Sequence, residues 1–241
     1  MKRFGLIGKN ISYSFSEEYF AEKFRSENIH ESSYEIFDLA EISGIGKLIR
    51  NKDLQGFNVT IPYKEQIVPF LDELTKEAVE IGAVNCVKIQ NGRKTGYNTD
   101  VYGFEESLKP LLEPHHRNAL ILGNGGAAKA VYFVLNKLNI SFKTVSRNGI
   151  FTYEDLNQEE IEKHDIIVNC TPVGTFPKID DAPDIPYEFL TGKHLLYDLI
   201  YNPGKTKFLQ LGERKNTKIK NGLEMLRLQA EKSWEIWNSP L

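Results

Sequence analysis

Three polar clusters in the first half of the chain bring together side chains suited to proton transfer and to binding a small ligand. One of them, at positions 56–64, reads Gly-Phe-Asn-Val-Thr-Ile-Pro-Tyr-Lys. In an extended segment Asn58 and Thr60 share one face, and Lys64 follows a turn whose backbone is restricted by proline. A lysine ammonium group held in a defined direction is a suitable acid for proton transfer at an oxygen atom. This cluster is therefore a candidate site for acid–base chemistry.

The other two clusters stand beside predicted helices. Asp100 ends the segment Gly-Tyr-Asn-Thr-Asp, where a carboxylate acts either as a helix cap or as a catalytic partner. Ser12, Ser14 and Ser16 precede another helix, where hydroxyl groups cap backbone N–H groups or bind an anionic ligand. Capping alone accounts for one of these three serines, and both interpretations stay open for Asp100.

The second half of the chain carries a glycine-rich turn typical of nucleotide binding. Positions 123–128 read Gly-Asn-Gly-Gly-Ala-Ala, which fits G-x-G-x-x-A between an apolar segment and an amphipathic one. This is the strand–turn–helix context that the motif requires. The first glycine permits a tight turn, and the second lets the backbone approach a pyrophosphate at the helix N-terminus. We expect cofactor contacts from Gly123, Asn124, Gly125, Gly126 and Ala127.

A second group of expected cofactor contacts follows the next predicted strand and consists of Ser146, Arg147 and Asn148. An NAD enzyme usually carries Asp or Glu here, about twenty residues after the glycine turn, for the ribose 2′-hydroxyl. These positions hold no acid. The planar guanidinium group of Arg147 can instead pair with a 2′-phosphate, which favours NADP over NAD. The alternative for Arg147 is an exposed surface side chain.

Short apolar runs alternate with amphipathic segments along the whole chain, which is typical of an α/β protein. Asn91-Gly92 between two short strands favours a two-residue hairpin turn. The polar segment 113–118 contains a proline and is typical of a linker. The strands that we predict lie at 3–8, 33–38, 56–59, 85–90, 93–98, 119–122, 141–146, 165–169 and 195–198.

The predicted architecture is two α/β domains, of which the second is a Rossmann-type, doubly wound NADP-binding domain at residues 101–220. The first, at residues 1–100, is a substrate-binding and catalytic domain. We expect an amphipathic C-terminal helix within 221–241 to pack back on it, because Leu223, Leu226, Ala230 and Trp234 recur at helical spacing. The reaction site would lie in a cleft between the two domains.

Composition excludes several classes of function. The chain has 30 Lys and Arg against 33 Asp and Glu, with the two signs interleaved, so it lacks the positive field that non-specific nucleic-acid binding needs. Its apolar runs are far shorter than the roughly 20 residues that span a bilayer, and glycines interrupt the apolar stretch at the N-terminus. We expect a cytoplasmic protein with no nucleic-acid or membrane partner, present as a monomer or a homodimer.

We expect no metal site. His115 and His116 are adjacent, but they lack the H-E-x-x-H spacing or a neighbouring cysteine that would suit a metal. The two cysteines, Cys86 and Cys170, lie far apart in apolar segments and are interpreted as reduced, structural residues.

Further short motifs accompany these clusters in a fixed order along nearly the whole chain. They are Gly5-Leu6-Ile7-Gly8, Ser14-Phe15-Ser16, Asn58-Val59-Thr60-Ile61-Pro62-Tyr63-Lys64, Gly82-Ala83-Val84-Asn85, Gly96-Tyr97-Asn98-Thr99-Asp100, Asn169-Cys170-Thr171-Pro172-Val173-Gly174, Asp198-Leu199-Ile200-Tyr201-Asn202-Pro203 and Asn221-Gly222-Leu223-Glu224-Met225-Leu226 with Gln229-Ala230. Together with the glycine turn, this ordered set resembles the shikimate dehydrogenase family.

The resemblance implies reversible NADPH-dependent reduction of 3-dehydroshikimate to shikimate, a step toward chorismate and the aromatic amino acids. It places Lys64 and Asp100 at the reacting C3 oxygen, with Lys64 as the proton-transfer group. The other residues expected at the site bind substrate or line the nicotinamide. Ser14, Ser16 and Tyr201 would bind the carboxylate. Thr60, Asn85 and Gln229 would bind the hydroxyl groups, together with Asn58 from the segment that holds Thr60. Leu199 and Gly222 would line the nicotinamide.

Two other functions stay open. The family often has a second basic residue close behind the arginine, and none follows Arg147 closely here, so a quinate/shikimate dehydrogenase that uses NAD or NADP is one alternative. The other is a nucleotide-sensing protein that kept the fold and lost catalysis. The presence of both Lys64 and Asp100 favours an enzyme, because a binding protein needs neither in a proton-transfer geometry.

Overall fold

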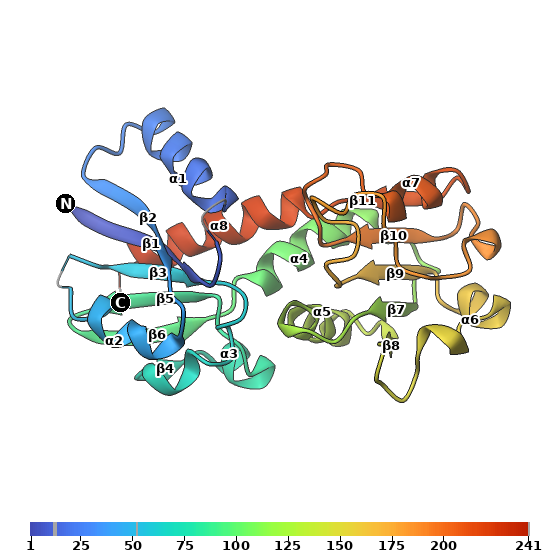
Figure 1. The fold of residues 1–241 in the computed structure, drawn as a ribbon, viewed down its shortest axis with the longest axis horizontal. Coiled ribbons are helices and arrows are strands. Elements are labelled where there is room, and N and C mark those ends of the chain that lie inside the picture. The colour runs from blue at the N-terminus through green and yellow to red at the C-terminus, as the bar shows by residue number, and fades with distance from the viewer. Residues whose placement is uncertain (12–13, 52, 241) are drawn as a thin grey trace. The chain divides into compact units, whose positions relative to one another are not determined.

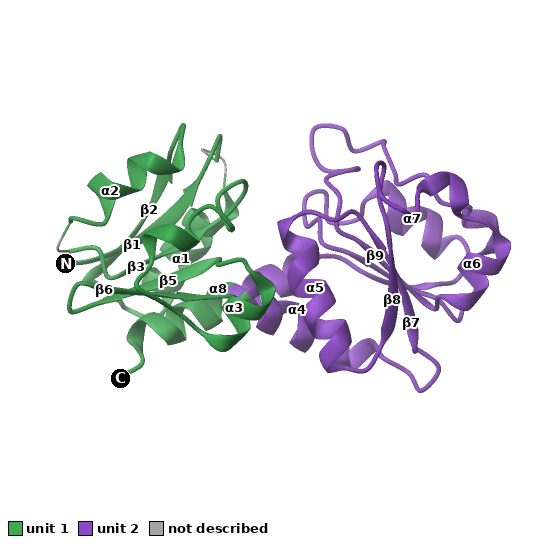
Figure 2. Cartoon of the chain, turned by 90° about the horizontal axis from the view of Figure 1, so that it is seen from below, with its two compact units in different colours: residues 1–99, 230–241 green, residues 100–229 purple. Residues whose placement is uncertain are grey.

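The computed structural model describes residues 1–11, 14–51 and 53–240. The chain forms two compact units, coloured separately in Figure 2. Unit 1 comprises residues 1–99 and 230–241, and unit 2 comprises residues 100–229. The division passes through the last helix, α8 (Leu223–Asn238), whose first turns belong to unit 2 and whose last turns belong to unit 1.

Unit 1 is built on a six-stranded mixed sheet with the order β2-β1-β3-β5-β6-β4 (Figure 1). Its strands are β1 (Lys2–Gly8), β2 (Ser32–Asp38), β3 (Gly56–Val59), β4 (Glu73–Leu74), β5 (Cys86–Gln90) and β6 (Arg93–Tyr97), and its helices are α1 (Phe15–Ser26), α2 (Ile45–Leu48), α3 (Lys76–Ile81) and the end of α8. The predicted hairpin is confirmed: β5 and β6 pair antiparallel, and Asn91 and Gly92 both have positive φ, 53° and 79°.

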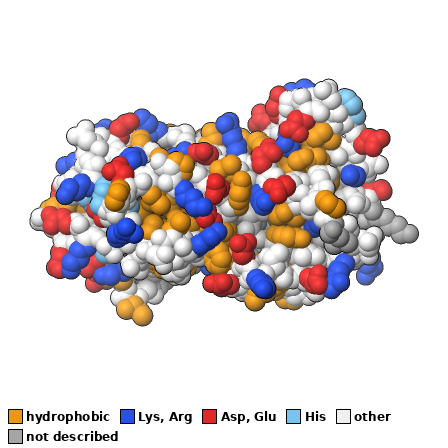
Figure 3. Space-filling model, turned by 180° about the vertical axis from the view of Figure 1, so that it is seen from behind, with side chains coloured by type: hydrophobic (Ala, Val, Ile, Leu, Met, Phe, Trp, Pro, Cys, Tyr) orange, Lys and Arg blue, Asp and Glu red, His pale blue; other side chains and the backbone are white. Residues whose placement is uncertain are grey.

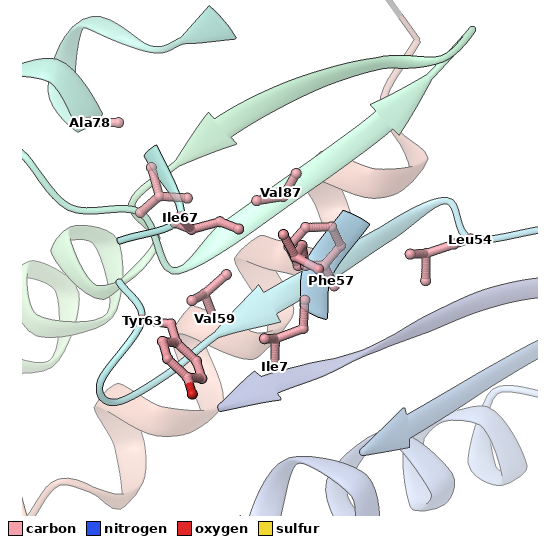
Figure 4. Packing of buried hydrophobic residues seen from close by; sticks show 10 residues of the cluster. Ile7, Leu54, Phe57, Val59, Tyr63, Ile67, Ala78 and Val87 are labelled. Carbon is pink, nitrogen blue, oxygen red and sulfur yellow. The ribbon is translucent and has the colours of Figure 1, made fainter. Parts of the chain in front are cut away.

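Alternation along β1 sends side chains to both faces of this sheet. Phe4 and Leu6 enter an aromatic core with α1 and α8, where Phe4 stacks on Trp237 with ring centroids 4.8 Å apart. Ile7 enters the opposite core, where it joins Phe57 and residues of α2 and α3 (Figure 4). Helices therefore cover both faces, and the polar ends of the strands remain available for a site.

Unit 2 is built on a five-stranded sheet with the order β11-β10-β9-β7-β8, in which every pairing is parallel (Figure 1). β7 lies between β8 and β9, so the chain runs from β7 to β8 on one side and then crosses back to β9 on the other side. Open α/β sheets bind ligands beyond the strand ends at such a reversal of strand order. The strands are β7 (Asn118–Leu122), β8 (Ser141–Val145), β9 (Ile166–Asn169), β10 (Leu195–Asp198) and β11 (Lys218–Lys220), and the helices are α4 (Asp100–Leu108), α5 (Gly126–Lys137), α6 (Gln158–Lys163), α7 (Lys207–Glu213) and the start of α8.

The central strands of unit 2, β7, β9 and β10, are buried on both faces, as in a doubly wound sheet. Leu120 and Leu196 pack on one face with side chains of α6 and α7, whereas the Tyr197 ring meets Phe104 of α4 edge-on with centroids 5.0 Å apart. The predicted fold class, two α/β units with a Rossmann-type parallel sheet, is confirmed. Short 3₁₀ turns lie at Ile42–Gly44, Val68–Phe70, Lys109–Leu111, Tyr153–Asp155 and Tyr187–Phe189.

Basic and acidic side chains lie interspersed on the molecular face shown in Figure 3. Among the helices that the structure describes, none has the length and the apolar character of a membrane span.

Candidate active site

The backbone around Lys64 is held by a tight turn after β3. The Tyr63 amide donates to the carbonyl of Thr60 at 2.9 Å, and the carbonyl of Lys64 accepts from the Val84 amide at 2.8 Å. The ring of Tyr63 is buried, and its hydroxyl donates to the Leu39 carbonyl at 2.7 Å. These contacts anchor the turn on both sides of Lys64, whose side chain is half-buried. The backbone that sets the direction of the Lys64 side chain is therefore held by packing and hydrogen bonds.

Asn85, just before β5, and Thr99, just after β6, are joined by hydrogen bonds in unit 1. The Thr99 amide donates to Asn85 Oδ1 at 2.6 Å, and Asn85 Nδ2 lies 3.0 Å from Thr99 Oγ1. Both residues are buried. Asp100 follows directly in the chain as the first residue of α4 in unit 2, and it is 7% exposed. It thus lies one position inside the helix, where a carboxylate also favours the N-terminal end of the helix dipole.

Asn58 on β3 is the centre of a buried polar network in unit 1. Its Nδ2 donates to the carbonyl of Asn85 at 3.1 Å and to Ser233 Oγ at 2.8 Å. Its Oδ1 accepts from the hydroxyl of Tyr34 at 2.9 Å. Ser233 Oγ also lies 3.2 Å from Thr99 Oγ1. This network connects expected substrate-binding residues to two residues, Tyr34 and Ser233, that the sequence did not single out.

The serine cluster has two distinct roles in the described structure. Ser14 is the N-cap of α1, and its Oγ accepts from the Ser16 amide at 3.3 Å. Ser16 lies in the first turn of α1; burial raises the pKa of Tyr34, and the Ser16 side chain acts against that shift. Ser12 and Tyr13, which belong to the same motif, lie outside the described residues.

The glycine turn of unit 2 lies between β7 and α5, at the reversal of the sheet. Gly123 has a φ of +97°, and its amide donates to the Val145 carbonyl at 2.8 Å. A Cβ at Gly123 would lie 2.9 Å from Thr171 Cγ2, so both the conformation and the space favour glycine. Gly125 is the N-cap of α5, and a Cβ at Gly125 or Gly126 would meet nothing within 4 Å. The space beside the start of α5 is therefore open at these two glycines, as a pyrophosphate site requires.

The other expected cofactor residues, in this turn and at the next strand end, differ in their exposure. Asn124 is exposed, Ala127 is half-buried, and Ala128 is buried in the first turn of α5. After β8, Ser146 is buried and its amide donates to the Phe151 carbonyl at 3.1 Å, which closes a short loop. Arg147 and Asn148 are exposed on this loop. The guanidinium group is thus accessible to a ligand phosphate.

Leu199 and Gly222 meet in unit 2 through their backbones. A Cβ at Gly222 would lie 2.1 Å from the Leu199 carbonyl oxygen, so no other residue fits there without movement. The Leu199 amide donates to the Asn169 carbonyl at 3.0 Å, and the Gly222 amide donates to the Ile200 carbonyl at 3.0 Å. The two expected nicotinamide-lining residues are therefore in contact and firmly held.

Asp198 is the last residue of β10, and it holds this strand end through hydrogen bonds. Its carboxylate is fully buried and accepts from Asn169 Nδ2 at 3.0 Å, the Ile200 amide at 3.0 Å and Thr206 Oγ1 at 2.5 Å. Burial raises the pKa of Asp198 to about 6, against the hydrogen bonds, which lower it. The loops after β9 and β10 are thereby tied to one buried carboxyl group.

Tyr201 and Gln229 complete the expected site residues. Tyr201 lies in the loop after β10 and is half-buried. Gln229 on α8 is 9% exposed, and its Nε2 donates to the Leu226 carbonyl at 2.9 Å. Gln229 therefore is not a freely solvated surface residue. Both belong to unit 2, whereas Ser14, Ser16, Asn58, Thr60, Lys64 and Asn85 belong to unit 1.

The histidine pair has structural contacts. His116 Nδ1 accepts from the Glu113 amide at 2.8 Å, so its Nε2 carries the proton and points to the Lys193 carbonyl at 3.2 Å. Burial lowers the pKa of His116. Within the part of the chain that the structure describes, no group of three or more His, Cys, Asp or Glu side chains could hold a metal ion.

A family model described as "Shikimate dehydrogenase substrate binding domain" matches residues 6–87. A shikimate dehydrogenase (NADP(+)) from Clostridium beijerinckii is 38% identical over 254 residues, which cover 98% of this chain and 92% of that protein.

Solved structures agree with this similarity. The chain is similar to shikimate dehydrogenase from Aquifex aeolicus, with a TM-score of 0.87, 33% identity, and coverage of 99% of this chain and 92% of the other. It is also similar to shikimate 5-dehydrogenase from Thermus thermophilus in complex with NADP(H) and shikimate, with a TM-score of 0.88, 32% identity, and coverage of 100% and 95%.

Proposed function

This chain belongs to the shikimate dehydrogenase family, and we propose that it catalyses the reversible NADPH-dependent reduction of 3-dehydroshikimate to shikimate. It is thus an NADP-dependent oxidoreductase acting on a CH–OH group, in the route to chorismate and the aromatic amino acids. The observation that carries the proposal is similarity to NADP-dependent shikimate dehydrogenases over 98% of the chain. The glycine turn before α5 and the hydrogen-bonded turn that carries Lys64 support it.

The residues of unit 2 fit NADP. Gly123 forms the tight turn and Gly125 leaves open space at the start of α5 for a pyrophosphate, and the exposed Arg147 would pair with the 2′-phosphate. Asn124, Gly126, Ala127, Ser146 and Asn148 would surround these two subsites. Leu199 and Gly222 would line the nicotinamide through backbone that is already held by hydrogen bonds. When bound, the nicotinamide supplies or accepts the hydride.

Lys64 and Asp100 would perform the proton transfer. As hydride reaches C3 of the ketone, the C3 oxygen gains negative charge and must take up a proton. The ammonium group of Lys64 would stabilise that charge and donate the proton, and Asp100 would hold Lys64 and the hydroxyl group that forms. In the oxidation of shikimate the same lysine, deprotonated, would accept the proton.

The remaining polar side chains would orient the substrate ring. Ser14, Ser16 and Tyr201 supply hydroxyl groups for the carboxylate. Thr60, Asn85 and Gln229 would supply directional partners for the ring hydroxyls. Asn58 would contribute through the second lone pair of Oδ1, because its amide hydrogens are both engaged inside unit 1. A compact polyhydroxy acid needs such a set of fixed donors and acceptors.

The experiment is a spectrophotometric assay at the reduced-nicotinamide band with shikimate or quinate, each with NADP or NAD. Turnover of shikimate with NADP is expected. Turnover of quinate or use of NAD at a similar rate would shift the assignment to a quinate/shikimate dehydrogenase. If all four mixtures stay silent while cofactor still binds, the chain is a nucleotide-binding protein and the proposal fails.

A matched pair of variants tests the role of Lys64. Lys64→Ala is expected to lower kcat at least about 100-fold, the range for loss of a general acid, with NADP binding retained. Lys76→Ala removes an exposed lysine of α3 in the same unit and is the control. Normal turnover by Lys64→Ala would remove Lys64 from the mechanism.

A further inference from the structure

We propose that Tyr34 and Ser233 are positioning residues for the substrate, because they hold Asn58 and Asn85 in one buried hydrogen-bonded network. The inference rests on the proposed function, which assigns those two side chains to the substrate site. It adds two residues to the machinery that lie behind the binding surface and act through the side chains they hold.

The orientation of the Asn58 amide is the central evidence. A carboxamide has two N–H donors and one acceptor oxygen. One donor of Asn58 goes to the carbonyl of Asn85 at 3.1 Å, and a carbonyl can only accept. The nitrogen and oxygen of this amide are therefore distinguished by chemistry. The second donor goes to Ser233 Oγ at 2.8 Å, and the oxygen accepts from Tyr34 at 2.9 Å.

Ser233 continues the chain to Asn85. Its Oγ lies 3.2 Å from Thr99 Oγ1, and Thr99 contacts both polar atoms of the Asn85 side chain, through its amide to Oδ1 at 2.6 Å and through its hydroxyl to Nδ2 at 3.0 Å. Ser233 on α8 thus supports two side chains of the substrate site at once, Asn58 directly and Asn85 through Thr99.

Tyr34 holds the oxygen of the Asn58 amide. Its hydroxyl donates to Asn58 Oδ1 at 2.9 Å. The ring cannot swing away, because it stacks on Phe20 with centroids 4.3 Å apart and an interplanar angle of 17°. Burial raises the pKa of Tyr34 well above its usual range, so the hydroxyl remains a donor throughout the working pH range.

Burial makes these links consequential for orientation. Tyr34, Asn58, Thr99 and Ser233 are 8%, 5%, 2% and 0% exposed. Water cannot easily replace a lost partner at such depth, so removing one hydroxyl leaves an Asn58 group unsatisfied and weakens the set of hydrogen bonds that fixes the orientation of this amide. A misoriented amide would weaken ground-state binding of shikimate. The hydride and proton transfers would be less affected, because Lys64 is held by a separate set of backbone contacts.

The test compares two hydroxyl deletions with the same deletions elsewhere. Tyr34→Phe and Ser233→Ala are each expected to raise KM for shikimate about fivefold or more, the effect of losing one neutral hydrogen bond. KM for NADP and kcat are expected to stay within about twofold. Tyr197→Phe and Ser107→Ala are the controls, because they delete hydroxyls of a buried Tyr–Ser pair of unit 2 that lie 2.6 Å apart. The controls are expected to leave KM for shikimate unchanged.

The double variant Tyr34→Phe/Ser233→Ala adds a second criterion. Because both hydroxyls act on Asn58, its rise in KM is expected to differ from the product of the single effects. Unchanged KM for shikimate in both single variants, with the wild type active, would overturn this inference and leave the proposed function intact. An equal rise in KM for NADP would reduce both residues to a general structural role. An inactive wild type that binds NADP would overturn the proposed function and this inference with it.

Discussion

Replacement of Gly222 by alanine is the sharpest perturbation of the proposed nicotinamide site. The new Cβ would lie 2.1 Å from the carbonyl oxygen of Leu199 and 2.6 Å from its carbonyl carbon, whereas ordinary contacts begin near 3.4 Å. The two backbones must therefore separate by about 1.3 Å, the difference between these distances. The obstacle is backbone, so no side-chain rotation relieves it.

The local hydrogen bonds resist this separation. The Gly222 amide donates to the Ile200 carbonyl at 3.0 Å, and the Leu199 amide donates to the Asn169 carbonyl at 3.0 Å. Overpacking of this kind costs about 1–3 kcal/mol of stability. A displacement of about 1 Å at a reacting group can lower the rate by about 100-fold. We therefore expect Gly222→Ala to lower kcat/KM for NADP by about two orders of magnitude while the protein remains folded.

The assay is steady-state kinetics with NADP varied at saturating shikimate, with thermal unfolding measured in parallel. Gly204→Ala is the matched control, because Gly204 lies in the same unit and a Cβ there would meet nothing within 4 Å. Gly222→Ala with kcat/KM within about threefold of the wild type would refute the reasoning, since the backbone contact would then have no bearing on the cofactor site.

Three further outcomes are expected. Arg147→Ala should raise KM for NADP at least about tenfold, the effect of losing a charge-assisted pair, and leave KM for NAD unchanged; equal effects on both cofactors would exclude contact with the 2′-phosphate. Asp198 binds a proton more readily in the folded protein, because burial raises its pKa to about 6, so its contribution to stability is present below about pH 4 and is lost as the pH rises through 6. In urea unfolding, the stability of Asp198→Asn relative to the wild type should therefore increase by up to about 3 kcal/mol from pH 4 to pH 7, and a constant difference would contradict this account. Trp237→Phe removes the donor to the buried Val87 carbonyl at 2.9 Å and should lower the free energy of unfolding by about 1–3 kcal/mol, measured by thermal denaturation; an unchanged midpoint would show that this hydrogen bond contributes nothing.

The parts of the site that could be predicted are those built by neighbours in the chain. The glycine turn at 123–128 joins one strand to the next helix, and its positive φ at Gly123 follows from local steric limits. The hairpin turn at Asn91 and Gly92 follows from the same rule. The sequence points to Lys64 because a proline lies two positions before it. Each of these signals acts within a few residues.

Only the tertiary structure decided how the polar side chains of unit 1 are oriented. Asn58 is 24 residues from Tyr34 and 175 residues from Ser233, yet it hydrogen-bonds to both. The sequence placed Asn58 and Thr60 on one face but could not show that both Asn58 donors are engaged inside the protein. Likewise, the contact between Leu199 and Gly222 explains why glycine is required at a position whose own turn would admit other residues. Periodicity and turn chemistry are local properties, whereas a buried hydrogen-bond partner is selected only when the sheet and α8 close around it and exclude water.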